Sequence, residues 1–289
     1  MEKKWGGNRH AKVTSNYMPT EKLLMPYAEF LYADHGDFDD YSPVRLNGEG
    51  YTEDIPWHVN LERDREVLIK YNAFMSSHSW AKKDVTFRSF NDTPFAAGRV
   101  HTLYQTITNR RVPIRQQTLL DGEPIAEPDF SANHLTLLSM IVDKPLPDSP
   151  YDMVSDDTGI SKQTVKTVLV RLMGAKDKQG WTQAKHTLQK SEHQLPGKHS
   201  ELIRASFYKC IPFLKDYDLL ATGWGGKLQF LEGETAIRMF EWAVDKQIPI
   251  INVHDAYACK KQDEIKVKET MYEKREESLS EIGKMRIKE

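Results

Sequence analysis

The sequence has few cysteines, almost no net charge and no long apolar run, and each lack bears on a class of protein. Its only two cysteines, Cys210 and Cys259, do not form a CxxC pair, so neither a zinc site nor a disulfide framework is indicated. The formal net charge of −2 gives no overall sign of a nucleic-acid binder. A phosphate backbone senses only the local charge of its groove, however, so the charge balance does not exclude one.

The absence of long apolar stretches also bears on where the protein works. No run reaches the ~18 apolar residues that a membrane span needs. The segment after Met1 leads into polar sequence without the apolar core of a signal peptide. We therefore expect a cytoplasmic protein without a membrane partner.

With 289 residues, 39% of them hydrophobic, the chain can form one large domain or two small ones. Residues 1–60 have many turn formers and poor periodicity, which predicts an irregular arm wrapping a larger body. Residues 61–75 have helical spacing. Residues 84–107 alternate and break at 91–94, which predicts strand, turn and strand.

The rest of the chain contains an alternation of strand and helix signals. Asp121-Gly122 predicts a hairpin turn, and a flexible turn is expected at residues 223–226. Strands are expected at 125–130, 248–253 and 256–259, and helices at 133–142, 161–175, 182–209 (on either side of Pro196-Gly197) and 232–246. A charged helix should begin at Asp263, and its balanced charges are most simply explained by a solvated face.

Two aspartates stand out by their position. Asp129 ends a strand and precedes a helix, and Asp255 lies at the tip of the hairpin between two apolar strands. A carboxylate at the end of a buried strand is costly unless something neutralises it. Two Mg²⁺ ions about 4 Å apart can share such a pair and carry out phosphoryl transfer. Two alternatives stay open: Asp129 caps the following helix, and Asp255 only makes the turn.

Three segments in order resemble the motifs of a known family. Residues 129–135 (DFSANHL) are similar to motif A of the family A DNA polymerases and the related phage single-subunit RNA polymerases. Lys162 and Lys166, followed by residues 173–176 (MGAK), resemble motif B. Residues 253–257 (VHDAY) resemble motif C, in which a His-Asp pair lies on a hairpin. The resemblance covers roughly residues 85–265.

The resemblance implies an α+β fold with a polymerase-like palm, which has a small antiparallel sheet and flanking helices, and with helical fingers. It implies an N-terminal arm and helix (1–84), a first palm part (85–160), the fingers (161–222), and a second palm part with the C-terminal helix (223–289). No thumb is recognisable. The implied function is nucleotide polymerisation on a primer–template, in a miniature enzyme of a phage or mobile element, within a bacterial or phage-infected cell.

The resemblance also implies roles for individual residues. Asp129 and Asp255 would be catalytic and would bind Mg²⁺, or Mn²⁺. Incoming nucleoside triphosphate would meet Lys162, Lys166, His134 and Phe130, while primer–template would meet Arg99, Gln229 and His254. Glu234 would be an auxiliary acid near the metals. For the lysines a solvated helix face, and for Arg99 an ordinary ion pair, are the open alternatives.

The sequence departs from the family at two positions. Met173 follows Lys166 by seven residues, whereas the family places a tyrosine eight residues after its lysine. His134 stands where DNA polymerases carry a glutamate that blocks a ribose 2′-OH, and its bulk weakly favours deoxyribonucleotides. Three alternatives therefore remain: an RNA polymerase, a decayed polymerase-like subunit that binds nucleic acid, and, ranked last, a two-metal nuclease. A protein partner would supply the thumb or processivity function.

Overall fold

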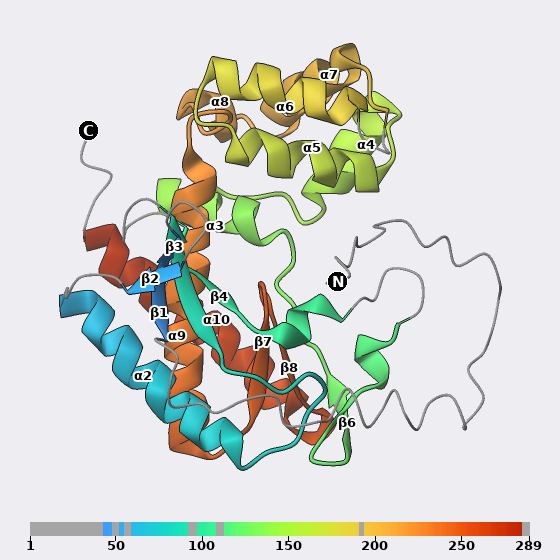
Figure 1. Ribbon diagram of the computed structural model, residues 1–289. Coiled ribbons are helices and arrows are strands. Elements are labelled where there is room, and N and C mark those ends of the chain that lie inside the picture. Colours follow the sequence, from blue (N-terminus) through green and yellow to red (C-terminus); the bar gives the residue numbers. More distant parts are fainter. Residues whose placement is uncertain are drawn as a thin grey trace, which may run out of the picture.

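Two small sheets and a set of surrounding helices make up the part of the chain that this computed structural model describes, which is residues 43–47, 52–54, 59–91, 97–107, 113–190 and 194–284. Each sheet has four strands. The mixed helix and strand content confirms the α+β class, and the sheets are small, as expected (Figure 1).

The first sheet has the order β2-β1-β3-β4. It consists of β1 (Val44–Asn47), β2 (Thr52–Asp54), β3 (Phe87–Asn91) and β4 (Arg99–His101). β1 and β3 are parallel and the other neighbours are antiparallel. The strands β3 and β4 confirm the two strands predicted within 84–107, whereas the predicted break falls mostly on residues 92–94, outside the described residues. The predicted irregularity of residues 1–60 is wrong for β1 and β2, because β1 pairs with β3 and β2 with β1, which orders segments too short to show a periodicity. Residues 1–42 of the predicted arm lie outside the described residues.

The second sheet has the order β5-β6-β8-β7 and is antiparallel throughout. It consists of β5 (Leu119–Leu120), β6 (Glu123–Ala126), β7 (Ile250–Val253) and β8 (Ala256–Lys260). The Asp121-Gly122 turn joins β5 to β6 with positive φ at both residues, as a tight hairpin requires. The strand expected at 125–130 ends earlier, at Ala126, because Pro128 has no N–H to continue the ladder.

The described helices flank these sheets or form a separate bundle (Figure 1). They are α2 (Val59–Ser76), α3 (Asn133–Val142), α4 (Pro150–Thr158), α5 (Lys162–Gly174), α6 (Lys178–Lys190), α7 (Gly197–Cys210), α8 (Phe213–Asp216), α9 (Trp224–Lys246) and α10 (Glu264–Lys284), with the 3₁₀ turns η2 (Leu103–Thr106), η3 (Arg115–Gln117) and η4 (Lys261–Asp263). None of the helices described is both long and apolar enough to cross a membrane.

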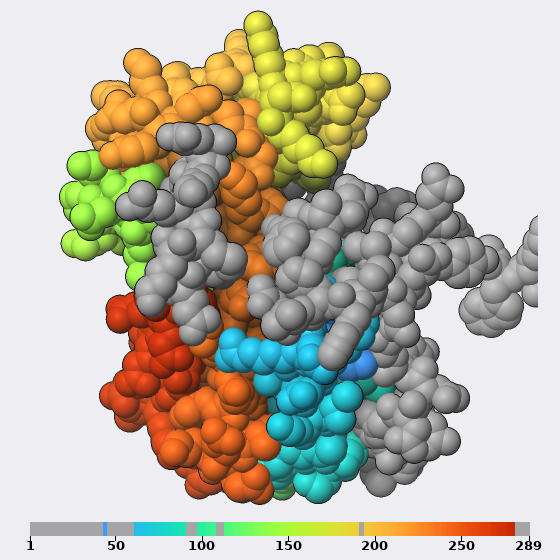
Figure 2. All heavy atoms as spheres, turned by 90° about the vertical axis from the view of Figure 1, so that its left-hand side faces the viewer, coloured from blue at the N-terminus to red at the C-terminus, as the bar shows by residue number. Residues whose placement is uncertain are grey.

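Two hydrophobic clusters divide the molecule into lobes. The sheet lobe buries residues between 44 and 130 and between 236 and 271, and the helical lobe buries residues between 135 and 231. Figure 1 shows the bundle α4–α8 above the sheets. Figure 2 shows the same division from the side: the yellow and light-orange spheres of the helical lobe lie above the orange, red and blue spheres of the sheet lobe. Helix α9 joins the two lobes, since Leu228 and Leu231 belong to the helical core and Ile237 and Phe240 to the sheet core.

The turn expected at residues 223–226 is wrong, because α9 already begins at Trp224. Only Gly223 has a left-handed backbone, with φ +84°. Gly225 is needed for packing instead: a Cβ at this position would lie 2.6 Å from the Met173 carbonyl oxygen of α5. The glycine therefore allows α9 to approach α5 closely and does not end the helix.

The charged C-terminal helix is present as α10, but it is not simply solvated. Along one side it buries Val267, Thr270, Met271, Arg275 and Ser278. These residues recur at helical spacing and face α9, against which α10 packs. The charge balance of the segment concealed this face because two of its buried positions are polar and one is an arginine.

Candidate active site

The segment that carries Asp129 pairs with the first residue of β8, directly after Asp255. Asp129 pairs with Ala256 in an isolated antiparallel bridge, and the next residue pair is fixed by a hydrogen bond from the Tyr257 N–H to the Pro128 carbonyl (3.1 Å). Antiparallel partners have Cα atoms about 4.5–5.5 Å apart. Asp129 therefore lies beside the residue that follows Asp255 in the chain, although 126 residues separate the two acids.

The protein environment makes both carboxylates reluctant to ionise. Burial raises the pKa of Asp129 to about 6, and the charge of Asp255 adds to the effect, while the Phe130 N–H and Lys166 partly oppose it. Burial likewise raises the pKa of Asp255, and the charge of Glu232 adds to it. The two acids thus repel each other in a partly desolvated place, which is the electrostatic condition for a cation site.

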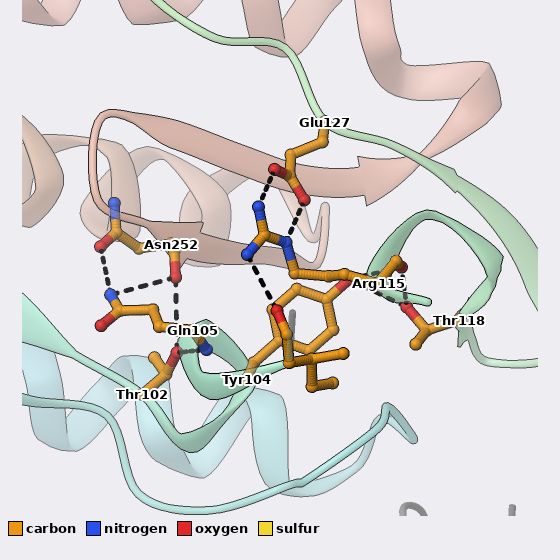
Figure 3. Close-up of polar contacts among 8 residues, drawn as sticks. Thr102, Tyr104, Gln105, Arg115, Thr118, Glu127 and Asn252 are labelled. Carbon is orange, nitrogen blue, oxygen red and sulfur yellow. Dashed lines mark hydrogen bonds and ion pairs between the residues drawn. The ribbon is translucent and has the colours of Figure 1, made fainter. Parts of the chain in front are cut away.

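Polar contacts hold the segments that lead into both acids (Figure 3). Arg115 holds Glu127, two residues before Asp129, through two hydrogen bonds of 2.7 and 2.6 Å. Gln105 donates to the Asn252 side chain (3.3 Å), and Asn252 donates to the His254 carbonyl at the hairpin tip (2.9 Å). η2 and η3 therefore support the segments that carry the two acids.

Backbone strain flanks the acids on both sides. His254 has φ +60° in the two-residue turn of the hairpin, and Ala132 has φ +48° just before α3. Non-glycine residues adopt this region at a cost of order 1 kcal/mol or more. Such strain is concentrated at functional sites, where the surrounding structure holds it in place.

Lys166 faces Asp129 across an open cavity of about 280 Å³. The cavity is also lined by Tyr151 and Lys162 and by the N-terminal end of α4. The Lys166 ammonium lies 5.2 Å from the centre of the Tyr151 ring, and its charge reaches Asp129. Lys162, by contrast, forms an ion pair with Asp152 (2.8 Å) at the rim. The structure thus brings both predicted lysines to the cavity, but only Lys166 is directed at the acid.

Glu232 is the third acid of the site, and it binds two residues predicted from the sequence and the chain neighbour of one of them. Its carboxylate contacts Arg99 (3.1 Å), His134 (2.8 Å) and the Asn133 amide (3.0 Å). Burial alone would raise the pKa of Glu232, but His134 and Arg99 together hold that pKa below its usual range. Its charge acts on Asp255.

Glu234, the acid expected near the metals, lies on another side of α9. It binds Arg88 (2.6 Å), which also binds Asp64. Successive helix residues turn by about 100°, so Glu232 and Glu234 diverge by roughly 200°. The prediction of Glu234 as auxiliary acid is therefore wrong in position, and Glu232 is the acid that the helix presents to Asp255.

Three other predicted residues occupy distinct positions. The Phe130 side chain is 5% exposed and belongs to the sheet-lobe core, although it also borders the cavity. His254 is exposed at the hairpin tip, yet partial desolvation of its imidazole by the surrounding protein, together with the charge of Arg99, lowers its pKa. Gln229 lies one turn before Glu232 on α9, half-buried, and makes no side-chain hydrogen bond within the described part of the chain.

The donor set is suited to Mg²⁺ or Mn²⁺. Asp129 and Asp255 offer the hard oxygen ligands that these ions prefer. A cation between them would relieve a repulsion that Lys166 offsets only in part. No group of three metal-ligating side chains gathers among the described residues, so water and substrate oxygens would complete the shell, as Mg²⁺ commonly requires.

Sequence reasoning did not find Tyr151, Glu232 as a site acid, or Arg115. Burial raises the pKa of Tyr151 to about 12, and the charge of Asp255 adds to this. Tyr151 also lines the same cavity as Asp129. α4 was not predicted at all, since its acidic and polar residues give a weak apolar stripe. The Ser149-Pro150 pair was the available signal, because proline is favoured in a first helical turn.

The sequence was also compared with protein-family models and with curated proteins. No family model and no curated protein matches this chain. The geometry of Asp129, Asp255 and Lys166 and the order of the three motifs therefore carry the functional argument.

Proposed function

We propose that this protein is a nucleotidyltransferase that polymerises nucleotides onto a nucleic-acid primer by two-metal phosphoryl transfer. The proposal is supported above all by the bridge between Asp129 and Ala256, which unites two acids of distant motifs opposite Lys166. A pair of helix-capping or turn residues would have no reason to share one repulsive site facing a lysine. The cavity is large enough for part of a nucleotide.

The metal site consists of Asp129 and Asp255. Bound Mg²⁺ or Mn²⁺ would activate the primer hydroxyl and stabilise the leaving pyrophosphate. Lys166 binds the triphosphate from the α5 side of the cavity and neutralises charge on the leaving group. Tyr151 supports the Lys166 ammonium by its ring face, at a distance of 5.2 Å.

Primer–template would lie on the side of the hairpin that carries His254. Arg99 is about one third exposed although it binds Glu232, so its guanidinium keeps donors for a phosphate. Gln229, one turn away on α9, is half-buried and has amide donors for a base edge. A protein partner would supply the thumb function.

A weak preference for deoxyribonucleotides follows from His134. Its imidazole is directed to Glu232 (2.8 Å) and its side chain keeps 17% exposure. A bulky side chain beside the acids leaves less room for a ribose 2′-OH than a small residue would. If the site accommodates a ribonucleotide despite His134, an RNA polymerase is the alternative.

A catalytically decayed, nucleic-acid-binding subunit is the second candidate. The ion pair between Lys162 and Asp152 supports it, because an acid lines the cavity that must accept a triphosphate. The absence of the family's tyrosine after Lys166 points the same way. Such a subunit would bind primer–template with an affinity that falls with salt, yet would not extend it.

The test is extension of labelled DNA and RNA primers on DNA and RNA templates with dNTPs or rNTPs, with Mg²⁺, Mn²⁺ or EDTA. We expect extension that requires a divalent ion and is more efficient with dNTPs. Binding without extension under every condition would favour the decayed subunit. Neither binding nor extension would contradict both proposals.

A further inference from the structure

Arg275 of α10 is a buried cation that forms no ion pair with an acid of the described residues. The residue is 6% exposed, and within the described part of the chain its guanidinium forms neither an ion pair nor a hydrogen bond. A charge in such a place is costly unless something compensates it. Burial accordingly lowers the pKa of Arg275.

Two aromatic rings surround this guanidinium. Its central carbon lies 4.4 Å from the Phe130 ring centre and 5.0 Å from that of Tyr272. The two rings also touch edge to face, with centres 5.3 Å apart. Arg275 and Tyr272 of α10 therefore both contact the Phe130 ring. The interaction that Arg275 makes is cation–π attraction to these rings.

Phe130 follows Asp129 directly, and its backbone N–H lies close enough to the Asp129 carboxylate to lower the pKa of that acid. The ring is 5% exposed, so its position fixes the orientation of this N–H. Arg275 also lines a water-sized cavity of about 10 Å³ with Asp255 and Glu232, on the inner side of the hairpin tip. The contacts of Arg275 and Tyr272 with Phe130 thus lie next to the two acids.

We propose that Arg275 is a positioning residue: it holds Phe130 from α10 and so orients the Asp129 carboxylate for a divalent cation. The inference rests on the proposed function, because it assumes that Asp129 and Asp255 bind a metal. A purely structural arginine in this place would affect stability but would leave the metal affinity of the folded protein unchanged.

The experiment titrates the full-length protein with Mn²⁺ and measures the free ion by electron paramagnetic resonance. Arg275→Met keeps the side-chain volume and removes the charge, and Arg275→Lys keeps a cation. Tyr272→Leu removes the second ring that contacts Phe130, at a partly exposed position. Arg238→Met is the matched control, since Arg238 is 7% exposed and faces Glu277 of α10. Circular dichroism melting confirms that each variant is folded.

We expect Mn²⁺ to bind about tenfold more weakly to Arg275→Met, as for other residues that orient metal ligands. Arg275→Lys should be intermediate, Tyr272→Leu should shift the affinity in the same direction by less, and Arg238→Met should bind as the wild type does. If Arg275→Met fails to fold, Tyr272→Leu decides alone. Unchanged affinity in the folded variants overturns the positioning role only, whereas a wild-type protein that binds no Mn²⁺ overturns the metal site itself.

Discussion

Asp129 and Asp255 are held in an arrangement that is unfavourable without a cation. Arg115 holds Glu127 near Asp129, and Asn252 holds the His254 carbonyl next to Asp255. Lys166 compensates for Asp129 in part, and His134 and Arg99 do so for Asp255. At the scale of single residues, the site is thus preorganised for positive charge.

Metal binding should therefore depend on pH in a range set by Asp129. Its pKa of about 6 means that a proton competes with the ion below pH 6. Only about one tenth of the carboxylate is ionised at pH 5, against about nine tenths at pH 7. We expect Mn²⁺ affinity to fall about tenfold between pH 7 and pH 5, measured by calorimetric titration. If the Mn²⁺ affinity does not change between pH 7 and pH 5, Asp129 is not a ligand.

The sequence could predict the two acids but only part of their surroundings. The motifs led to Asp129, Asp255 and Lys166 because these residues stand at strand ends and on one helix face. They led to Glu234 instead of Glu232, since a chain segment does not reveal which side of a helix meets the acids. Tyr151 and Arg115 were missed because their approach to the site is set by tertiary packing.

Helix α5 presents its two lysines unequally. Lys162 and Lys166 share one helix face, but Lys162 forms an ion pair with Asp152, whereas Lys166 forms none within the described residues and its charge acts on Asp129. We expect Lys166→Met to lower kcat/KM for the nucleotide about a hundredfold, as loss of a preorganised charge does. Lys162→Met should cost only a few-fold, because its exposed ion pair already competes for the ammonium. Steady-state extension kinetics compare the two.

The reverse order of effects would contradict this assignment of the α5 face. A useful companion is Asp152→Asn, which frees Lys162. It should lower KM for the nucleotide while leaving Lys166 in place.

Two helix glycines show how local propensity and packing diverge. A Cβ at Gly233 of α9 would lie 2.0 Å from the Gly98 carbonyl oxygen, whereas nothing lies within 4 Å of a Cβ at Gly174 of α5. We expect Gly233→Ala to lower the free energy of unfolding by about 2–3 kcal/mol through overpacking. Gly174→Ala should be neutral or raise it by up to about 1 kcal/mol. Urea denaturation measures both, and equal effects would contradict the close approach of α9 to the backbone that enters β4.

Element prediction succeeded where periodicity or turn chemistry was strong. The helix predicted at 133–142 has those bounds in α3, and the hairpins at 121–122 and 254–255 are present. It failed at the start of α9, where glycines that permit close packing resembled a turn. It also failed for β1 and β2: the few residues of β1 are ordered by β3, a strand distant in the sequence, and β2 is ordered by β1.

At the scale of the whole molecule, a buried cluster fastens α9 to the sheet lobe. Arg88 of β3 is fully buried and binds Asp64 of α2 (2.5 Å) and Glu234 of α9 (2.6 Å). Because α9 also carries Glu232 into the site, this cluster indirectly fixes the lobes around the cavity.

Arg88→Met should lower the free energy of unfolding by about 3–5 kcal/mol at pH 8, because it leaves the buried Asp64 and the half-buried Glu234 without their partner. Burial already raises the pKa of Asp64 to about 6 although Arg88 opposes it. Without Arg88, the folded-state pKa of Asp64 should rise further. Such acids favour the folded state only while protonated, so the deficit should be smaller at pH 5 than at pH 8.

Arg63→Met is the control for this prediction, since its exposed ion pair with Glu241 also joins α2 to α9. That substitution should cost less than about 1 kcal/mol. A deficit in Arg88→Met that does not depend on pH would contradict the account of the cluster.

The most direct test of the central claim is primer extension by three aspartate variants. Asp129→Asn and Asp255→Asn keep the side-chain size and remove a carboxylate oxygen from each motif, and Asp156→Asn alters an exposed residue of α4 as the control. We expect Mg²⁺-dependent extension by the wild type and by Asp156→Asn, and a loss of at least about a thousandfold in each of the other two. Undiminished extension by Asp129→Asn and Asp255→Asn would contradict the proposed polymerase site.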